Sequence, residues 1–285
     1  MKLIFGCGYL GRRVARQWVG AGEEVHAVTR REDRATILAE EAFRPIVADV
    51  TRPETLVDLP PAETVLLAVG YDPRSGQSRR RVYVEGLRNV LEALPEDVGR
   101  IVMVSSTGVY GDHQGAWVDE QTPCRPTREA GEAFLAAEAL LREHRLGNRA
   151  LILRMAGIYG PGRVMRKPEL LSGEPVAVAP GYLNLIHVED AARAVLAAEA
   201  KAAPPRTYVV SDGRPVERRD YFCLLAALLG APEPRFAELS ASDVAGRRGS
   251  DNKRVCNARI VAELGFRPEY PSCPEGLAAA IEPER

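Results

Sequence analysis

Three glycines near the N-terminus, Gly6, Gly8 and Gly11, constrain the fold more than any other feature. They follow the apolar run 3–5 at G-x-G-x-x-G spacing, and an amphipathic helical pattern begins at once. In such a strand–turn–helix unit the first glycine permits the turn, the second lets the backbone approach a pyrophosphate, and the third lets the helix pack close to the strand. The pattern predicts dinucleotide binding, with a glycine-rich turn that holds no ligand as the alternative.

Strand and helix patterns alternate along the first half of the chain. Apolar runs predict strands at 3–5, 24–29, 44–48, 64–69, 100–105 and 150–154, and periodic segments predict helices at 31–42, 78–94 and 127–145. This alternation implies parallel strands joined by right-handed crossovers. We therefore predict an α/β fold with a doubly wound parallel sheet (a Rossmann fold) and a ligand at the carboxyl ends of its strands.

After residue 155, glycines and prolines interrupt the rhythm repeatedly. A strand over 183–188 and a helix over 189–200 are expected to return to the sheet. The remaining patterns are a strand at 207–210 and helices near 220–229, 257–264 and 274–281. We predict a dinucleotide-binding Rossmann domain over 1–155, to which 184–204 return, and a smaller discontinuous α+β lobe over 156–285. A small-molecule substrate is expected in the cleft between them.

Composition excludes several classes of protein. The formal net charge is −1, so no nucleic acid or anionic membrane is expected as a partner. The five cysteines are scattered without a C-x-x-C pair, so neither a disulfide framework nor a metal site is indicated. Run 3–5 is too short for a signal peptide, and no run reaches the roughly 18 apolar residues of a membrane span. We expect a cytoplasmic protein with free thiols.

The end of the second predicted strand indicates which dinucleotide binds. Thr29, Arg30 and Arg31 stand where an NAD site normally places an acid for the ribose 2′-hydroxyl. Guanidinium groups grip phosphate, so this segment favours NADP; alternatively, Arg30 and Arg31 only begin a solvated helix. Asp49 could accept from the adenine amino group or cap a helix. The predicted cofactor-binding residues are Gly6, Gly8, Tyr9, Leu10, Gly11, Thr29, Arg30, Arg31, Asp49, Val50, Ala68, Val69, Gly70 and Ser105.

Four further segments carry a resemblance that covers almost the whole chain. They are V-S-S-T-G-V-Y-G at 104–111, L-R-M-A-G-I-Y-G-P-G at 153–162, I-H-V-E-D-A-A at 186–192 and Y-V-V-S-D at 208–212. With the glycine turn they resemble the extended short-chain dehydrogenase/reductase superfamily, of the NAD(P)-dependent epimerase/dehydratase type. The resemblance implies a nicotinamide cofactor and a Y-x-x-x-K pair, in which the tyrosine is the acid/base and the lysine holds the nicotinamide ribose.

That pair is absent from this sequence. A gapless alignment of the long-helix segment places Ala130 at the tyrosine position and Phe134 at the lysine position. No tyrosine lies between 111 and 158, and the first lysine after Lys2 is Lys167, so a small shift of the alignment restores neither residue. Typical extended members also have G-x-x-G-x-x-G. The sequence therefore resembles an atypical subgroup.

The resemblance leaves two catalytic candidates. Ser106 occupies the position of the superfamily's catalytic Ser/Thr, with strand capping as its alternative role, and Tyr110 lies in a segment that approaches the cleft. Other residues that could replace the acid/base are His113, Glu120, Tyr159 and His187. For His187 a place in the core is the alternative, and for both tyrosines a place in the pocket wall.

Two functions remain open. The first is an NADP-dependent oxidoreductase or epimerase/dehydratase-type enzyme with non-standard acid/base residues, acting on an unknown small molecule such as a sugar derivative. The second is an NADP-binding sensor or regulatory protein without turnover. Family members often dimerise through the helices that match 78–94 and 127–145. A stripe through Phe134, Ala137 and Leu141 could form such a homodimer or face the sheet.

Overall fold

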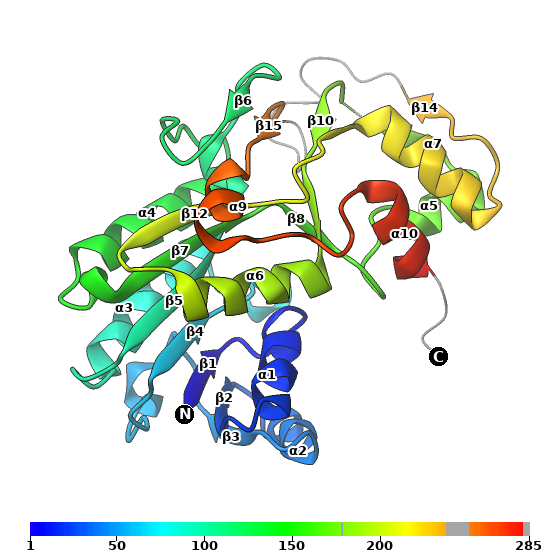
Figure 1. Cartoon of the computed structure of the whole chain (residues 1–285). Coiled ribbons are helices and arrows are strands. Elements are labelled where there is room, and N and C mark those ends of the chain that lie inside the picture. Colours follow the sequence, from blue (N-terminus) through cyan, green and yellow to red (C-terminus); the bar gives the residue numbers. More distant parts are fainter. Residues whose placement is uncertain (178, 238–250, 282–285) are drawn as a thin grey trace. The chain divides into compact units, whose positions relative to one another are not determined.

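A seven-stranded sheet combines strands that lie between residues 2 and 210. The computed structural model describes residues 1–177, 179–237 and 251–281, so parts of the predicted lobe over 156–285 lie outside the described residues. The strand order is β12-β7-β5-β4-β1-β2-β3 (Figure 1). Its strands are β1 (Lys2–Phe5), β2 (Val25–Thr29), β3 (Arg44–Val47), β4 (Thr64–Leu67), β5 (Arg100–Ser106), β7 (Ala150–Met155) and β12 (Arg206–Val210).

The first five strands pair in parallel, β1 with β2 and β4, β2 with β3, and β4 with β5. The chain runs outward from β1 to β3 on one side and then crosses to β4 and β5 on the other. The order therefore reverses between β1 and β4, which is where doubly wound sheets bind ligands. The predicted fold class is confirmed.

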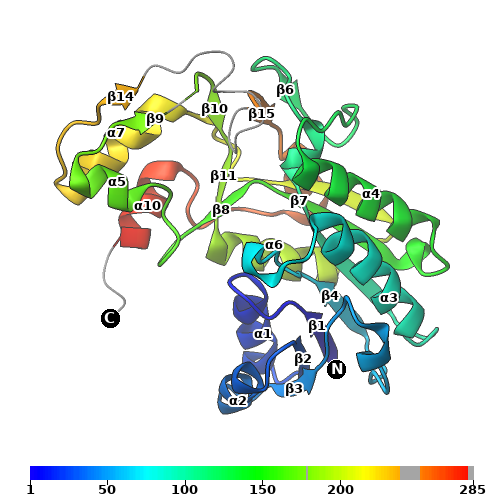
Figure 2. The ribbon, with the colours of Figure 1, turned by 180° about the vertical axis from the view of Figure 1, so that it is seen from behind.

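Helices cover both faces of this sheet. They are α1 (Gly11–Gly20), α2 (Glu32–Glu40), α3 (Gly86–Ala93), α4 (Glu129–Glu143) and α6 (Val188–Lys201). Helices α3 and α4 lie side by side on one face (Figure 2), while α1 and α6 lie on the other (Figure 1). Short helical turns are η1 (Pro53–Thr55), η2 (Pro73–Ser75), η4 (Thr107–Tyr110) and η5 (Gly147–Arg149), and a π-helical turn, η3 (Arg81–Glu85), leads into α3.

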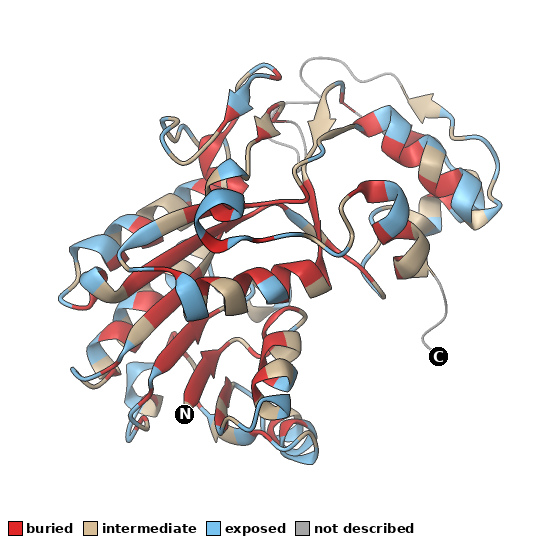
Figure 3. Ribbon diagram, viewed as in Figure 1, coloured by how far each residue is buried: buried red, intermediate tan, exposed pale blue. Residues whose placement is uncertain are grey.

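The hydrophobic core around the central sheet forms because several strands are buried on both faces. All residues of β1, β4 and β7 are buried, and these strands are red in Figure 3. Ala137 and Leu141 of α4 belong to the same core, and Phe134 packs against it. The apolar stripe of the long helix therefore faces inward.

Glu199 of α6 joins three other elements of the same unit. Its carboxylate accepts hydrogen bonds from Trp18 Nε1 of α1 at 2.6 Å and from Thr64 Oγ1 of β4 at 2.7 Å. The same group lies 2.7 Å from the Lys2 ammonium of β1. Four elements therefore meet at one carboxylate, which follows Trp18 by 181 residues and Thr64 by 135.

The returning strand differs from the prediction. The segment 183–188 forms β10 (Tyr182–Leu183) and β11 (Leu185–His187), and β11 pairs with β8 (Gly157–Tyr159) in a separate two-stranded sheet. It is β12 that adds to the central sheet, next to β7. The prediction that 183–188 returns to the sheet was therefore wrong: an apolar run shows that a strand is buried, but not which strand it joins.

The remaining elements are short. They are β6 (Trp117–Val118), α5 (Lys167–Ser172), β9 (Val176–Ala177), β13 (Val216–Glu217), α7 (Arg218–Leu229), β14 (Phe236–Ala237), β15 (Arg254–Val255), α9 (Ala258–Leu264) and α10 (Cys273–Ile281). A second apolar core packs α7 and α10 around Tyr221, Leu225 and Leu277. The three helices expected after residue 205 are thus present with nearly the predicted bounds.

Contacts divide the chain into two compact units. Unit 1 comprises Met1–Ser106, Glu129–Arg154 and Ala192–Tyr208; unit 2 comprises Thr107–Arg128, Met155–Ala191 and Val209–Arg285. The segment from Thr107 to Arg128 belongs to unit 2, although it precedes the predicted boundary after residue 155.

Candidate functional site

A cavity of about 200 Å³ opens at the glycine turn of unit 1. Residues at or just after the carboxyl ends of β1, β2, β3 and β4 contribute to its wall. The lining residues are Phe5, Gly6, Cys7, Gly8, Val28, Thr29, Arg30, Arg34, Ala48, Val50, Val69 and Gly70. Of the predicted cofactor residues, the structure brings together Gly6, Gly8, Thr29, Arg30, Val50, Val69 and Gly70 at this cavity.

The three glycines of the turn differ in the space around them. Gly6 has a φ of +93°, and a Cβ there would lie 2.3 Å from the carbonyl oxygen of Ala68. A Cβ on Gly11 would lie 2.3 Å from the carbonyl oxygen of Gly6, so this glycine allows α1 to start against the turn. A Cβ on Gly8 would meet nothing within 4 Å. Gly8 therefore presents bare backbone to open space, as close approach of a ligand requires.

The start of α1 adds a favourable field for an anion. Its N-cap residue, Leu10, makes no side-chain capping hydrogen bond, and the first turn of the helix carries no acidic residue. The partial positive charge of the helix N-terminus is therefore not neutralised by this helix's own side chains. A phosphate group suits such a terminus, because it accepts hydrogen bonds from backbone N–H groups and is stabilised by the helix dipole.

Two arginines line the cavity beyond β2. Arg30 is exposed, and its guanidinium lies 3.9 Å from the Asp72 carboxylate, a long surface contact of small energetic weight. Arg34, one turn into α2, is the second cation of the lining. Arg31 was predicted beside Arg30, but its Nε donates to Asp33 Oδ1 at 2.8 Å, and Arg31 is not among the lining residues. Arg34 was missed because helix phase, and not chain order, decides which arginine faces the strand ends.

Cys7 lies at the bottom of the same turn and is 7% exposed. Burial raises the pKa of its thiol to about 11, although the nearby cations Arg34, Arg12 and Arg16 oppose that shift. The thiol therefore stays protonated at neutral pH and serves as a small apolar part of the wall. No motif in the sequence singled it out.

Other predicted cofactor residues have different surroundings. The Asp49 carboxylate accepts from the Thr51 N–H and hydroxyl, each at 2.8 Å, so it closes a turn of the kind expected from a cap. Tyr9 lies beneath the Arg13 guanidinium, 4.4 Å from ring to cation. The Ser105 hydroxyl is buried and donates to Glu138 Oε1 at 2.6 Å. Leu10 is buried next to the turn.

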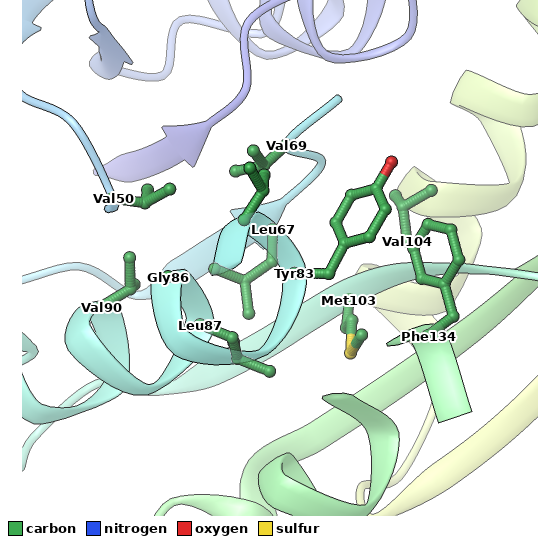
Figure 4. Close-up of a pocket in the computed structure, with 11 residues that line it drawn as sticks. Val50, Leu67, Val69, Tyr83, Gly86, Leu87, Val90, Met103, Val104 and Phe134 are labelled. Atoms are coloured by element: carbon green, nitrogen blue, oxygen red, sulfur yellow. The ribbon is translucent and has the colours of Figure 1, made fainter. Parts of the chain in front are cut away.

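A second, smaller cavity of about 40 Å³ lies beside the first and is almost wholly apolar (Figure 4). It shares Val50 and Val69 with the larger cavity. Phe134, at the position of the expected lysine, forms part of its wall together with Tyr83 and Val104. An apolar ring therefore stands where the resemblance led us to expect an ammonium group.

The candidate catalytic residues differ in how far their side chains are exposed and in the partners that they contact. Ser106 is partly exposed at the last position of β5. Tyr110 is fully buried, which argues against contact between its hydroxyl and a substrate. His113 Nε2 lies 3.1 Å from the carbonyl oxygen of Tyr110. The Glu120 carboxylate accepts from the Val209 N–H at 2.8 Å and pairs with Arg259 at 3.5 Å, so it joins segments of unit 2.

Tyr159 and His187 are both buried in unit 2, with their rings 5.5 Å apart edge to face. Near Tyr159 lies Asp212, whose Oδ1 accepts from the Arg214 N–H at 2.9 Å. Within the part of the chain that the structure describes, no donor reaches the buried Asp212 Oδ2. Burial raises the pKa of Asp212 to about 7, with the neighbouring Asp190 charge acting in the same direction.

The described residues contain neither a cluster of metal ligands nor a membrane-spanning helix. Across 1–177, 179–237 and 251–281, no three His, Cys, Asp or Glu side chains gather in a group that could hold a metal ion. In the same ranges, no helix combines the length and apolar character needed to cross a membrane.

Comparison with known proteins agrees with this geometry. The model of the NAD dependent epimerase/dehydratase family matches residues 3–211. Protein YeeZ of Escherichia coli (strain K12) is 27% identical over 274 residues, which cover 94% of this chain and 95% of YeeZ.

Two solved structures extend the likeness. A functionally unknown conserved protein from Silicibacter pomeroyi is 30% identical, with a TM-score of 0.75 and coverage of 98% of this chain and 97% of that one. MoeE5 in complex with UDP-glucose and NAD is 25% identical, with a TM-score of 0.77 and coverage of 99% and 97%. On the strength of the family match over residues 3–211, the chain belongs to the NAD-dependent epimerase/dehydratase family of the extended short-chain dehydrogenases/reductases.

Proposed function

We propose that this protein is an NADP(H)-dependent enzyme of the oxidoreductase or epimerase/dehydratase type, acting on a small molecule such as a sugar derivative. The observation that carries the proposal is the cavity at the glycine turn, where Gly8 offers open backbone beside the uncapped start of α1. These residues fit the diphosphate of a dinucleotide, because a side chain at Gly8 would occupy the space that the phosphates need.

Positive charge at the carboxyl end of β2 and in the first turn of α2 supports NADP over NAD. The cavity wall contains Thr29, Arg30 and Arg34, and no carboxylate is among the described residues that line it. A ribose 2′-hydroxyl usually meets an acid at this place, whereas a 2′-phosphate meets guanidinium groups. Arg30 and Arg34 are therefore the proposed 2′-phosphate contacts, while Asp49 and Arg31 keep structural partners.

The chain's own residues would bind and orient, while the nicotinamide group, when bound, supplies the hydride chemistry. The glycine turn holds the diphosphate and the arginines select the 2′-phosphate. Ser106, at the carboxyl end of β5, is the proposed hydrogen-bond donor to a substrate oxygen. Ala130 and Phe134 carry no titratable group, so the proton must come from another residue.

Calorimetric titration of NADP and NAD tests the cofactor assignment. Arg30→Ala and Arg34→Ala should each weaken NADP binding about 10–100-fold, the range of a lost charge-assisted contact, and leave NAD within about twofold. Arg31→Ala is the matched control, because its guanidinium is paired with Asp33 and should change neither affinity. Equal losses for both dinucleotides in the Arg30 and Arg34 variants would refute the 2′-phosphate assignment.

A non-catalytic NADP-binding sensor is the second candidate, favoured by Ala130 and Phe134 in place of the Y-x-x-x-K pair. The two candidates separate in a metabolite screen that follows NADPH absorbance at 340 nm. Turnover of any carbonyl or sugar compound that Ser106→Ala reduces at least tenfold supports the enzyme. Tight NADPH binding with no turnover across the screen supports the sensor.

A further inference from the structure

Tyr83 and Phe134 form a stacked pair in unit 1. Their ring centroids are 4.4 Å apart with an angle of 26° between the planes. Both rings are partly exposed and belong to the wall of the apolar cavity. Figure 4 shows the Tyr83 ring beside Val104 and Phe134, with its hydroxyl directed away from Leu87 and Met103. Tyr83 therefore adds a phenol hydroxyl to a wall that is otherwise lined by apolar residues.

The position of this pair relative to the glycine turn follows from the sheet. The strand order reverses between β1 and β4, and a dinucleotide lies across such a reversal. Thr29 and Arg30 mark the adenosine side over β2, so the other half of the ligand extends over β4 and β5. Val69 follows β4 and Val104 belongs to β5; both line the apolar cavity with Tyr83. The pair thus lies on the nicotinamide side.

The backbone at Tyr83 is unusual. Tyr83 is the central residue of the π-helical turn Arg81–Glu85, which precedes the regular helix α3. Single π-helical turns are rare and occur frequently at functional sites, because the extra residue shifts the direction of the side chains around it. This observation is independent of the stacking and of the cavity.

We propose that Tyr83 contacts the nicotinamide–ribose half of the bound dinucleotide through its hydroxyl, while its ring packs on Phe134. This inference rests on the proposed function, since it needs a dinucleotide in the larger cavity. It places a phenol hydroxyl from η3, the π-helical turn before α3, at the nicotinamide half of the ligand.

The test compares two ligands and two variants by calorimetry. NADP has the nicotinamide half, and 2′,5′-ADP has only the adenosine half with its 2′-phosphate. Tyr83→Phe keeps the ring and the stacking but removes the hydroxyl. Tyr71→Phe is the matched control, because it makes the same chemical change at a neighbouring ring, 6.5 Å from that of Tyr83, whose hydroxyl donates to the Gln77 carbonyl at 3.0 Å.

Tyr83→Phe should weaken NADP about 3–10-fold, as the loss of one neutral hydrogen bond does, and leave 2′,5′-ADP within about twofold. Tyr71→Phe should leave both ligands unchanged. Unchanged NADP affinity in Tyr83→Phe, or equal losses for both ligands, would overturn the assignment of Tyr83. If the unmutated protein bound neither ligand, the proposed function itself would fail, which is a different result.

Discussion

Glu138 in unit 1 and Asp212 in unit 2 are both buried carboxyl groups, yet their pKa values move in opposite directions. Burial raises the pKa of Glu138, but hydrogen bonds and charge from Arg154, with the Ser105 hydroxyl and Arg142, bring it below its usual value. Arg154 Nη2 lies 2.7 Å from Glu138 Oε2. At Asp212 the Arg214 N–H and charge offset the desolvation only in part, and the pKa rises to about 7.

The difference shows that burial alone does not set the state of a carboxyl group; the number of donors aimed at it does. Glu138 joins α4 to β5 and β7 as an ion, so it helps to hold β5, the strand that carries Ser106. Asp212 follows β12 among Tyr159, Cys273 and Asp190, where burial favours the neutral carboxyl over the charged one.

Removal of the main partner of Glu138 should have the largest effect. Arg154→Ala leaves a carboxylate with 0% exposure short of its main counterion, and we expect unfolding free energy to fall by about 3–5 kcal/mol in urea titrations. Arg142→Ala is the control, since its side chain is 42% exposed and it should cost less than about 1 kcal/mol. Equal effects of the two variants would show that Glu138 does not depend on its buried partner.

The next largest effect is expected from Asp212, which should make the unfolding free energy depend on pH. Its pKa is higher in the folded state than in the unfolded state, so the folded state holds the extra proton between about pH 4 and 7. Stability from this group is therefore complete below pH 4 and is lost as pH rises towards 7. We expect the difference in unfolding free energy between the protein and Asp212→Asn to change by up to about 3 kcal/mol from pH 4.5 to 7. A difference independent of pH would show that Asp212 does not titrate in this window.

The smallest loss of stability is expected when the Ser105 hydroxyl, an uncharged donor to Glu138, is removed. Ser105→Ala removes one hydrogen bond to a buried carboxylate and should lower unfolding free energy by about 2 kcal/mol. The same variant sharpens the site assignment, because a Ser105 hydroxyl committed to Glu138 should not affect NADP affinity. Loss of NADP binding at unchanged stability would restore the cofactor role predicted from the sequence.

Local patterns predicted the elements of unit 1 because their causes are local. Strands of consecutive apolar residues, such as 64–67, can only be buried on both faces, and the glycine turn needs a positive φ at Gly6 and a close approach at Gly11. Most helix ends fell within two residues of the prediction; the exception is 78–94, where the π-helical turn replaces the start of α3.

Contacts between distant segments could not be predicted in this way. Whether Arg31 or Arg34 faces the cavity depends on where α2 begins, and α2 begins at Glu32. The stacking of Tyr83 on Phe134 joins residues about fifty positions apart, and no periodicity reports it. For the same reason the sequence could not tell that β12, and not 183–188, would pair beside β7.

The Glu199 contacts have a consequence for synthesis on the ribosome. Trp18, Thr64 and Lys2 emerge first, but the carboxylate that joins them is added only after more than 130 further residues. Until then the nascent sheet lacks both that anchor and its edge strand β12. A domain folds late when the segments that contact each other lie far apart in the chain. We therefore expect unit 1 to emerge from the ribosome incompletely folded and to need protection from aggregation until β12 and Glu199 have been added.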